Sequence, residues 1–426
     1  MIVVGVALLV FALLGAPLFT IIAASALVGF YSQEIDLSVA AIEIYRLAEM
    51  PVMVAIPLFT FAGYLLSESQ APQRLVRLTN ALMGWMPGGL ALVSLAACAL
   101  FTAFTGASGV TIVALGALLV PALKEAGYGE RFNLGLITTS GSLGLLFAPS
   151  LPIILYGVVV QQMSLETPVS IDQLFLAGVL PGLLMVVLLA IYSMLQKRHT
   201  APVANIAQSS PGIGAALRES AWEIPLPFIV LGGIYSGYFA VSEAAAVTAL
   251  YVLVVEVGIQ REISLRHLPA VMRESMITVG GILVILGASL ASTNYLVDAG
   301  IPSAILETIR AHVDSKWTFL ILLNAFLLAL GMMLDIFSAL VLIVPILLPI
   351  AMGYDIHPIH FGIIFLANMQ LGYFTPPVGM NLFIASYRFD KPVMELYVAS
   401  LPFFFILLIA VLMITYWPDL SLILVR

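Results

Sequence analysis

The chain has 426 residues, of which 62% are hydrophobic and 9% charged, and its formal net charge is −7. A soluble protein of this length needs far more charged surface, so the composition excludes a water-soluble globular domain and predicts an all-α polytopic membrane protein. The basic residues are few and scattered, which argues against nucleic-acid binding. A single cysteine, Cys98, excludes an internal disulfide and a cysteine-based metal cluster.

Residues 1–50 are expected to form one membrane span and an acidic connection. The apolar run 2–30 has no basic n-region and is longer than the apolar core of a signal peptide. It is therefore interpreted as a retained spanning helix. The segment 31–50 that follows carries four acidic residues against the single Arg46.

A first block of the chain, residues 51–196, begins with a predicted span at 51–68. In the next segment, 69–85, apolar residues recur at helical spacing beside Arg74 and Arg77. This segment is too short and too charged to cross a bilayer. The pattern predicts an interfacial helix that lies flat on the membrane.

The remainder of the first block contains two interrupted segments. The stretch 88–122 is longer than the roughly 20 residues that one span requires, and its middle is polar. It predicts a re-entrant helical hairpin that turns near 104–111 and returns to the same side. A broken span is expected at 132–158, followed by a full span at 174–196.

A connecting region, 197–273, contains a linker rich in serine, proline and glycine and two predicted spans, 222–239 and 242–260. It leads to a second block, 274–426. The predicted elements of the second block are a span at 274–296, an interfacial helix at 300–315, a hairpin at 317–350 that turns near 331–338, a broken span at 360–386 and a final span at 396–420.

The broken span at 360–386 is apolar enough for a bilayer, yet its middle contains two adjacent prolines, Pro376 and Pro377. Two prolines remove two backbone donors and interrupt the helix. Broken backbone at membrane depth is tolerated only inside protein or beside water. Transporters use such breaks to bind ions and substrate. A proline-kinked helix without a ligand is the alternative for this segment taken alone.

The same interruption occurs in the first block. When the two broken spans are aligned, Gly144 falls opposite Gly372 and Pro149 falls opposite Pro377. The two blocks therefore share one plan. Corresponding interrupted segments in two halves of a chain are the best sequence pointer to a transporter's binding site.

Lysine and arginine positions predict the orientation, because cytoplasmic loops carry an excess of basic residues. With the N-terminus inside and the C-terminus outside, twelve basic residues fall inside and four outside. The two hairpins then open to opposite sides, so the repeats are inverted, as alternating access requires. The four outside are Arg46, Arg310, Lys316 and Arg426.

The two hairpin tips and the two breaks should meet near the membrane midplane. They offer hydroxyls, an amide, one carboxylate and exposed backbone, which suit Na⁺ and an anionic substrate. The first pair contributes Thr105, Gly106, Ser108, Gly109, Ser140, Gly141, Ser142 and Gly144, and the second contributes Asp335, Ser338, Gly372, Thr375 and Asn381.

Two of these assignments have structural alternatives. An intramembrane carboxylate such as Asp335 is a functional hypothesis by default, but it could equally cap a helix at the hairpin turn. Ser108 and Ser142 could contact a ligand or bond back to a carbonyl in their own helices. The chain has no HExxH, P-loop or GxSxG motif, so no residues support an ATP-driven or hydrolytic reaction.

At these residues the chain resembles the large membrane subunit of tripartite ATP-independent periplasmic (TRAP) transporters. The matching stretches cover nearly the whole chain and include SGSLGLLFAPSLPIILYG from Ser140, LGGIYSGYFAVSEAAAV from Leu231 and GYFTPPVGMNLF from Gly372. The chain departs from the family where two prolines usually occur, at Ala148-Pro149. It also departs where a Thr-Pro-Thr-Glu-like turn is usual, at 240–243.

The resemblance implies an elevator-type, Na⁺-coupled importer in the bacterial inner membrane, with no organic cofactor and no enzymatic activity. The implied partners are a small four-helix membrane subunit, a secreted periplasmic substrate-binding protein and lipid. The implied substrates are organic acids such as C4-dicarboxylates and sialic acid. A standalone Na⁺/carboxylate symporter of the same superfamily is the alternative within transport. A membrane-embedded enzyme or a channel would be a different class.

The resemblance also implies two Na⁺ sites with the substrate between them. By position, one Na⁺ site is carried to Ser108, Gly141 and Ser142, and the other to Asp335, Gly372 and Thr375. Their neighbours at the tips and breaks, Thr105, Gly106, Gly144 and Ser338, are further candidate Na⁺ ligands. The candidate substrate residues are Ser142, Pro149, Ser150, Thr375 and Asn381.

Overall fold

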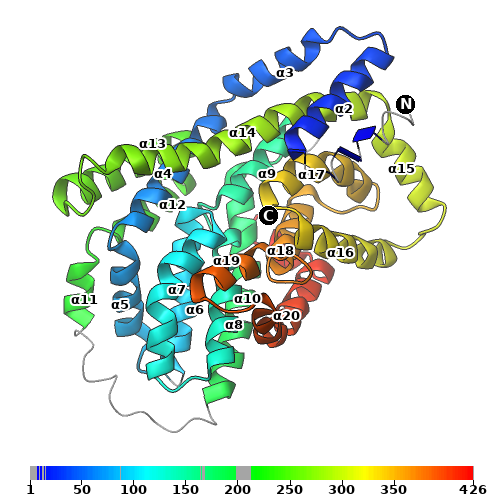
Figure 1. The fold of residues 1–426 in the computed structure, drawn as a ribbon. Coiled ribbons are helices and arrows are strands. Elements are labelled where there is room, and N and C mark those ends of the chain that lie inside the picture. The colour runs from blue at the N-terminus through cyan, green and yellow to red at the C-terminus, as the bar shows by residue number, and fades with distance from the viewer. Residues whose placement is uncertain are drawn as a thin grey trace.

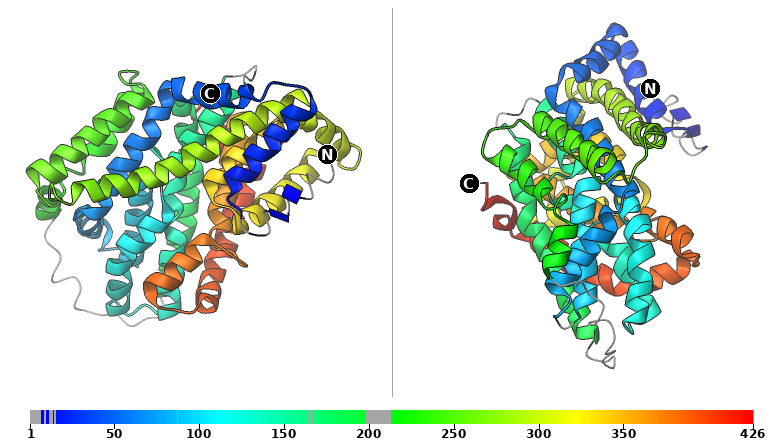
Figure 2. Two further views of the ribbon diagram at one scale, coloured as in Figure 1. Left: turned by 45° about the horizontal axis from the view of Figure 1, so that its top comes forward. Right: turned by 90° about the vertical axis from the view of Figure 1, so that its left-hand side faces the viewer.

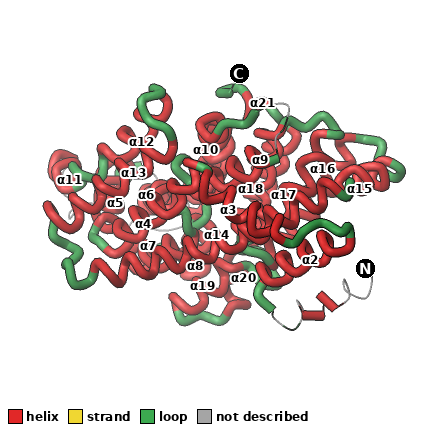
Figure 3. The backbone as a smooth tube through the Cα atoms, turned by 90° about the horizontal axis from the view of Figure 1, so that it is seen from above, coloured by secondary structure: helices red, strands yellow, loops and turns green. Residues whose placement is uncertain are grey.

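The computed structural model describes residues 16–86, 88–163, 165, 168–197 and 213–425, together with a few isolated residues before 16. Throughout these ranges the regular structure is helical and no strand is present (Figure 3). Seven described helices are long and apolar enough to cross a membrane. The prediction of an all-α polytopic protein is confirmed. The seven are Pro51–Glu68, Ser108–Glu125, Ile171–Gln196, Val241–Ile259, Leu268–Leu296, Lys316–Met333 and Val393–Tyr416.

The first block contains two long helices with a hairpin and a broken pair between them. Its two broken-span segments, Glu130–Leu146 and Leu151–Gln162, are bent by 41° and together would make an eighth span. The elements are η1 (Pro51–Val54), α4 (Ala55–Glu68), α5 (Ala71–Met83), α6 (Gly89–Thr105), α7 (Ser108–Glu125), α8 (Glu130–Ser140), η2 (Leu143–Leu146), α9 (Leu151–Gln162) and α10 (Ile171–Lys197).

The second block repeats this order of elements. A long helix is followed by a short amphipathic helix, two helices separated by two residues, a broken pair and a second long helix. The elements are α14 (Leu268–Asp298), α15 (Ile301–Arg310), α16 (Lys316–Met333), α17 (Ile336–Met352), α18 (Pro358–Gly372), α19 (Met380–Phe389), α20 (Val393–Tyr416) and the terminal turn α21 (Asp419–Leu422).

The N-terminal helices lie at the outer edge, beside α14 (Figures 1 and 2). Of the predicted span 2–30, the structure describes α2 (Leu18–Ser32), which begins after Pro17, while most of the residues before 16 are outside the described part. The acidic connection contains a helix that the sequence did not predict, α3 (Ser38–Glu49), which packs against α14.

The connecting region differs from its prediction in one respect. The second expected span corresponds to α13 (Val241–Leu253) and the π-helical turn η3 (Val254–Ile259), which together cover 19 residues. The first corresponds only to α12 (Pro225–Tyr235), because the chain turns at 221–224 and again after Tyr235. The short helix α11 (Ile213–Glu219) precedes this turn, and most of the predicted linker is outside the described residues.

The long helix α4 contacts both α13 and α14, and the three form a layer on which the hairpins and breaks lie. Helix α4 contacts α6 and α9, and α14 contacts α17. The approach is close where α4 meets the first hairpin, because a Cβ added at Gly63 would lie 2.7 Å from Thr105 Cα. The layer therefore carries interrupted segments from both blocks, side by side in one apolar core (Figure 1).

Candidate functional site

The tip of the first hairpin contacts the break in the second block. Helix α6 ends at Thr105, Gly106 turns the chain with a φ of +65°, and α7 begins at Ser108. Ser108 Oγ donates a hydrogen bond of 2.7 Å to Asn381 Oδ1, and Asn381 Nδ2 donates one of 3.3 Å to Thr138 O in α8. All three groups are buried. Two predicted site residues from opposite halves of the chain are therefore in direct contact.

The first break packs against its own hairpin. A Cβ added at Gly144 would lie 2.3 Å from Ala99 O on α6, so only glycine permits this approach. The Gly141 carbonyl, which the break releases from helical bonding, accepts a hydrogen bond of 2.8 Å from Thr102 Oγ1. Thr102 was expected in the polar middle of the hairpin but not at the predicted site, because its contact with Gly141 joins two separate segments of the chain.

The second break packs against its hairpin in the corresponding way. A Cβ added at Gly372 would lie 2.5 Å from the carbonyl carbon of Gly331 on α16. Gly144 and Gly372, which the sequence alignment pairs, thus both face the first helix of the neighbouring hairpin. The bonds Ala148–Pro149 and Pro376–Pro377 are both cis.

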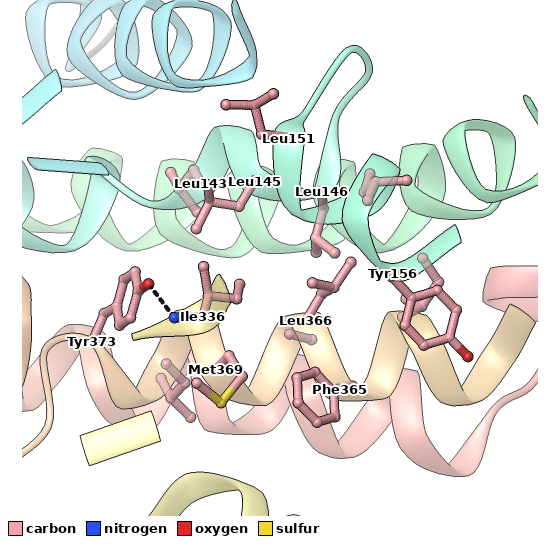
Figure 4. Close-up of a cluster of buried hydrophobic side chains, with 14 of the residues drawn as sticks. Leu143, Leu145, Leu146, Leu151, Tyr156, Ile336, Phe365, Leu366, Met369 and Tyr373 are labelled. Atoms are coloured by element: carbon pink, nitrogen blue, oxygen red, sulfur yellow. Dashed lines mark hydrogen bonds between the residues drawn. The ribbon is translucent and has the colours of Figure 1, made fainter. Parts of the chain in front are cut away.

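The two breaks also lie against each other across an apolar contact, because η2 packs on α18. Figure 4 shows Leu143, Leu145 and Leu146 of the first break facing Leu366 and Met369 of the second block. These side chains are fully buried. The contact between the first break and α18 is therefore made by packed hydrocarbon side chains.

Asp335 caps helix α17. Its Oδ1 accepts hydrogen bonds of 3.0 Å from the backbone N–H groups of Phe337 and Ser338. The next N–H, of Ile336, donates to Tyr373 Oη at 2.7 Å, so the tip is tied to the second break (Figure 4). Asp335 therefore acts as a helix cap. Its side chain is only half-buried, so a cation could also approach the carboxylate.

Two predicted hydroxyls bond within their own segments. Ser142 Oγ donates to Thr139 O at 3.1 Å, and Thr375 Oγ1 donates to Leu371 O at 2.7 Å. Both side chains are buried. These are the back-bonding arrangements that Ser and Thr adopt near helix ends, and each leaves the oxygen lone pairs available to a further partner.

Three other hydroxyls near the first tip and break are buried and, within the described residues, have no hydrogen-bond partner. They are Thr105 Oγ1, Thr138 Oγ1 and Ser150 Oγ, and each residue is at most 1% exposed. Pro149 is buried beside Ser150. Orphaned buried oxygens are uncommon in folded proteins and suit a hard cation or ordered water. The neutral oxygen atoms present here therefore fit a Na⁺ ion.

A cavity of about 440 Å³ lies next to the first tip, between α7, α19 and the helices α4 and α14. Gly109, the neighbour of Ser108, forms part of its wall. It is an open groove with two carboxylates, Glu68 and Glu274, in its wall, and none of the residues predicted to bind substrate lines it. Its lining residues are Tyr64, Ser67, Glu68, Gly109, Val110, Val113, Ala114, Glu274 and Ile384.

Long apolar helices, two hairpins and two paired helix breaks define this chain as a polytopic membrane transporter of the broken-helix type. The family model for the tripartite ATP-independent periplasmic transporter, DctM component, matches residues 5–420. The chain belongs to this family and is the large permease of a TRAP system, a multi-pass inner-membrane protein.

Two individual relatives are also named as TRAP transporter permeases. The chain is 34% identical to the C4-dicarboxylate TRAP transporter large permease protein DctM of Rhodobacter capsulatus, over 92% of this chain and 91% of that protein. It is 32% identical to the isethionate TRAP transporter permease protein DctMQ of Oleidesulfovibrio alaskensis, over 95% of this chain and 61% of that protein. The solved structure of the Alcanivorax borkumensis YdaH transporter has the same fold, with a TM-score of 0.64 at 14% identity over 90% of this chain and 88% of that one.

Proposed function

We propose that this permease imports an organic acid across the inner membrane by symport with Na⁺, after receiving the acid from a periplasmic binding protein. The observation that carries the proposal is the buried contact between Ser108 and Asn381. It joins a hairpin tip of one half to the helix break of the other. Broken helices that meet in this way are the construction in which transporters bind ions and substrate.

Two groups of residues would hold Na⁺. The orphaned hydroxyl of Thr105 and the neighbouring groups at the first tip supply neutral oxygens, and Asp335 supplies a carboxylate at the second tip. A bound Na⁺ would supply positive charge that attracts an anionic substrate. The first site would consist of Thr105, Gly106, Ser108, Gly141, Ser142 and Gly144, and the second of Asp335, Ser338, Gly372 and Thr375.

The substrate would lie between the two tips. Within the described residues, the arginines of the two broken spans are Arg131 at the start of α8 and Arg388 at the end of α19, and both are exposed, so backbone N–H groups and hydroxyls would hold a carboxylate. The residues proposed for this role are Ser142, Pro149, Ser150, Thr375 and Asn381. The acids named for the relatives, C4-dicarboxylate and isethionate, support a small anionic substrate.

Inverted repeats and an elevator movement complete the proposal. The hairpins and breaks would move together against the layer of α4, α13 and α14, with the N-terminus cytoplasmic and the C-terminus periplasmic. A small membrane subunit would accompany the permease. The relative named DctMQ, of which this chain covers 61%, supports this partner.

Uptake into proteoliposomes tests the proposal. The permease with its small subunit should accumulate acid only when a Na⁺ gradient and a loaded binding protein are both present. Uptake that needs Na⁺ but no binding protein would favour a standalone symporter. Uptake that is indifferent to Na⁺ would contradict the proposed coupling, and flux that does not saturate would indicate a channel.

A further inference from the structure

Three glutamates from separate segments converge on one arginine, none of them among the predicted Na⁺ or substrate residues. Arg74 on α5 forms an ion pair with Glu223 in the turn before α12, with 2.6 Å between Nε and Oε1. Arg74 Nη1 pairs with Glu262 in the loop after η3. Arg74 Nη2 lies 3.5 Å from Oε1 of Glu256, which belongs to the π-helical turn η3 itself. We call these four residues the Arg74 cluster.

The Arg74 cluster is buried. The exposed fractions of the side chains are 8% for Arg74, 4% for Glu223, 1% for Glu256 and 15% for Glu262. Three ionised carboxylates around one guanidinium would leave two negative charges in excess. Buried charge that is not compensated costs several kcal/mol, on the order of the penalty for burying a single ion. The cluster therefore requires additional positive charge.

Glu256 is the carboxyl with the weakest partners. Glu223 has a short bond to Arg74, and Glu262 accepts both from Arg74 and, at 2.7 Å, from the backbone N–H of Gln70. Among the described residues, Glu256 has no well-formed hydrogen bond: its polar neighbours are Arg74, at 3.5 Å, and the side chain of Ser69. Its side chain is also the most deeply buried of the three. π-Helical turns such as η3 occur frequently at functional sites.

We propose that the Arg74 cluster is a proton-binding site and that Glu256 holds the proton as a neutral carboxylic acid in this conformation. The proton replaces one of the two missing positive charges and removes the need to bury a carboxylate whose nearest cationic atom, Arg74 Nη2, lies 3.5 Å away. It is held apart from the Na⁺ and substrate residues, which lie at the tips and breaks.

The position of the cluster connects this proton to the moving parts. In chain order, helix α5 lies between the layer helix α4 and the first hairpin, which begins with α6. Arg74 anchors α5 to α12, η3 and the loop that precedes α14. Loss of the proton adds a third carboxylate charge beside Glu223 and Glu262 and weakens this anchorage. The proton therefore sets how firmly the first hairpin is attached to the layer.

The charged groups near the cluster are exposed. Arg261, which precedes Glu262 in the chain, donates from Nε to Gly258 O at 3.4 Å. On the exposed face of α5, Arg77 Nη1 lies 2.9 Å from Glu219 Oε2. At the end of α4, Glu68 lies 3.5 Å from His267. Within the cluster, Glu223 lies in a turn outside the spanning helices, and burial raises the pKa of its carboxyl. A raised carboxyl pKa contributes stability at low pH that is lost as pH rises through the folded-state pKa.

Infrared spectroscopy and thermal unfolding of the full chain in detergent test the proposal. Wild-type protein near neutral pH should show the carbonyl band of a protonated carboxyl, and Glu256→Gln should remove that band. The melting temperature of the wild type should fall by about 2 °C or more between about pH 5 and about pH 8. Glu256→Gln mimics the neutral acid, so it should keep the acidic melting temperature and lose most of this dependence.

Glu219→Gln is the matched control, because it neutralises a glutamate that also pairs with helix α5, through the exposed Arg77. It should leave both the band and the pH dependence unchanged. A wild type without the band, or a Glu256→Gln variant that keeps the pH dependence, would overturn the proposal. Should Glu256→Gln fail to fold, hydrogen exchange of residues 71–83 in the wild type decides: faster exchange at the higher pH supports the proposal, and equal protection overturns it.

Discussion

The tips of the two hairpins are held by different chemistry. The first tip is joined through neutral groups, Ser108 and Asn381, to the opposite half of the chain. The second tip is held by a carboxylate, Asp335, that caps its own helix, and by Tyr373 from the break in its own half. One tip thus links the halves, while the other is completed locally. The comparison predicts that damage at the first tip should uncouple the halves, and damage at the second should remain local.

The largest effects are expected at the two helix breaks, which pack in the same way on their own hairpins. Gly144→Ala and Gly372→Ala should each destabilise the protein by about 1–3 kcal/mol and abolish most uptake. The added Cβ would lie 2.3 Å and 2.5 Å, respectively, from backbone atoms of the neighbouring hairpin. Melting temperature in detergent and uptake in proteoliposomes measure the two effects.

Gly232→Ala on α12 is the control, because a Cβ added there meets nothing within 4 Å. It should be neutral. If Gly144→Ala were tolerated as well as Gly232→Ala, the close packing of the first break on its hairpin would be unnecessary for transport.

Both pairs of interrupted helices could be predicted from sequence because their signals lie within single segments. Prolines and glycines interrupt each broken span, and each hairpin is too long for one span. The contacts of Thr102 with Gly141 and of Tyr373 with Ile336 could not be predicted, because they join positions that are 39 and 37 residues apart, respectively. No periodic pattern brings such positions together.

The burial of the Arg74 side chain could not be predicted from the sequence either. The sequence places Arg74 and Arg77 three residues apart on one helix, which predicts similar exposure. In the structure the Arg77 side chain is 51% exposed and the Arg74 side chain 8% exposed. The difference arises from three glutamates more than 140 residues away in the chain. The turn that holds Glu223 also shortens α12 relative to the predicted span.

The next largest effect is expected at the link between the halves. Asn381→Ala would leave the Ser108 hydroxyl and the Thr138 carbonyl without their partner, at a cost of about 1–3 kcal/mol. Uptake should fall more steeply than stability, since the alignment of the two halves is lost. Ser386→Ala on the same helix removes a bond of 2.6 Å to Lys391 O and is the control. Equal effects from both variants would remove the special role of the cross-half contact.

A smaller and more selective effect is expected at the second tip. Asparagine is a good N-cap, so Asp335→Asn should keep the melting temperature close to wild type. The loss of the carboxylate charge should raise the Na⁺ concentration for half-maximal uptake by about tenfold or more. Asp335→Ala, which also removes the cap, should in addition lower stability by about 1 kcal/mol. Unchanged Na⁺ dependence in Asp335→Asn would leave capping as the only function of this residue.

The smallest effects are expected from the hydroxyls that bond within their own segments. Ser142→Ala and Thr375→Ala each remove one oxygen whose existing partner is a nearby carbonyl, so both proteins should insert and melt normally. If both oxygens also contact Na⁺, each variant should raise the half-maximal Na⁺ concentration by roughly two- to tenfold. Ser94→Ala, which removes a buried hydroxyl bonded at 2.8 Å to Leu90 O on α6, is the control. A shift in Ser142→Ala alone would place the cation beside the first tip only, and wild-type uptake in both variants would exclude these hydroxyls from the site.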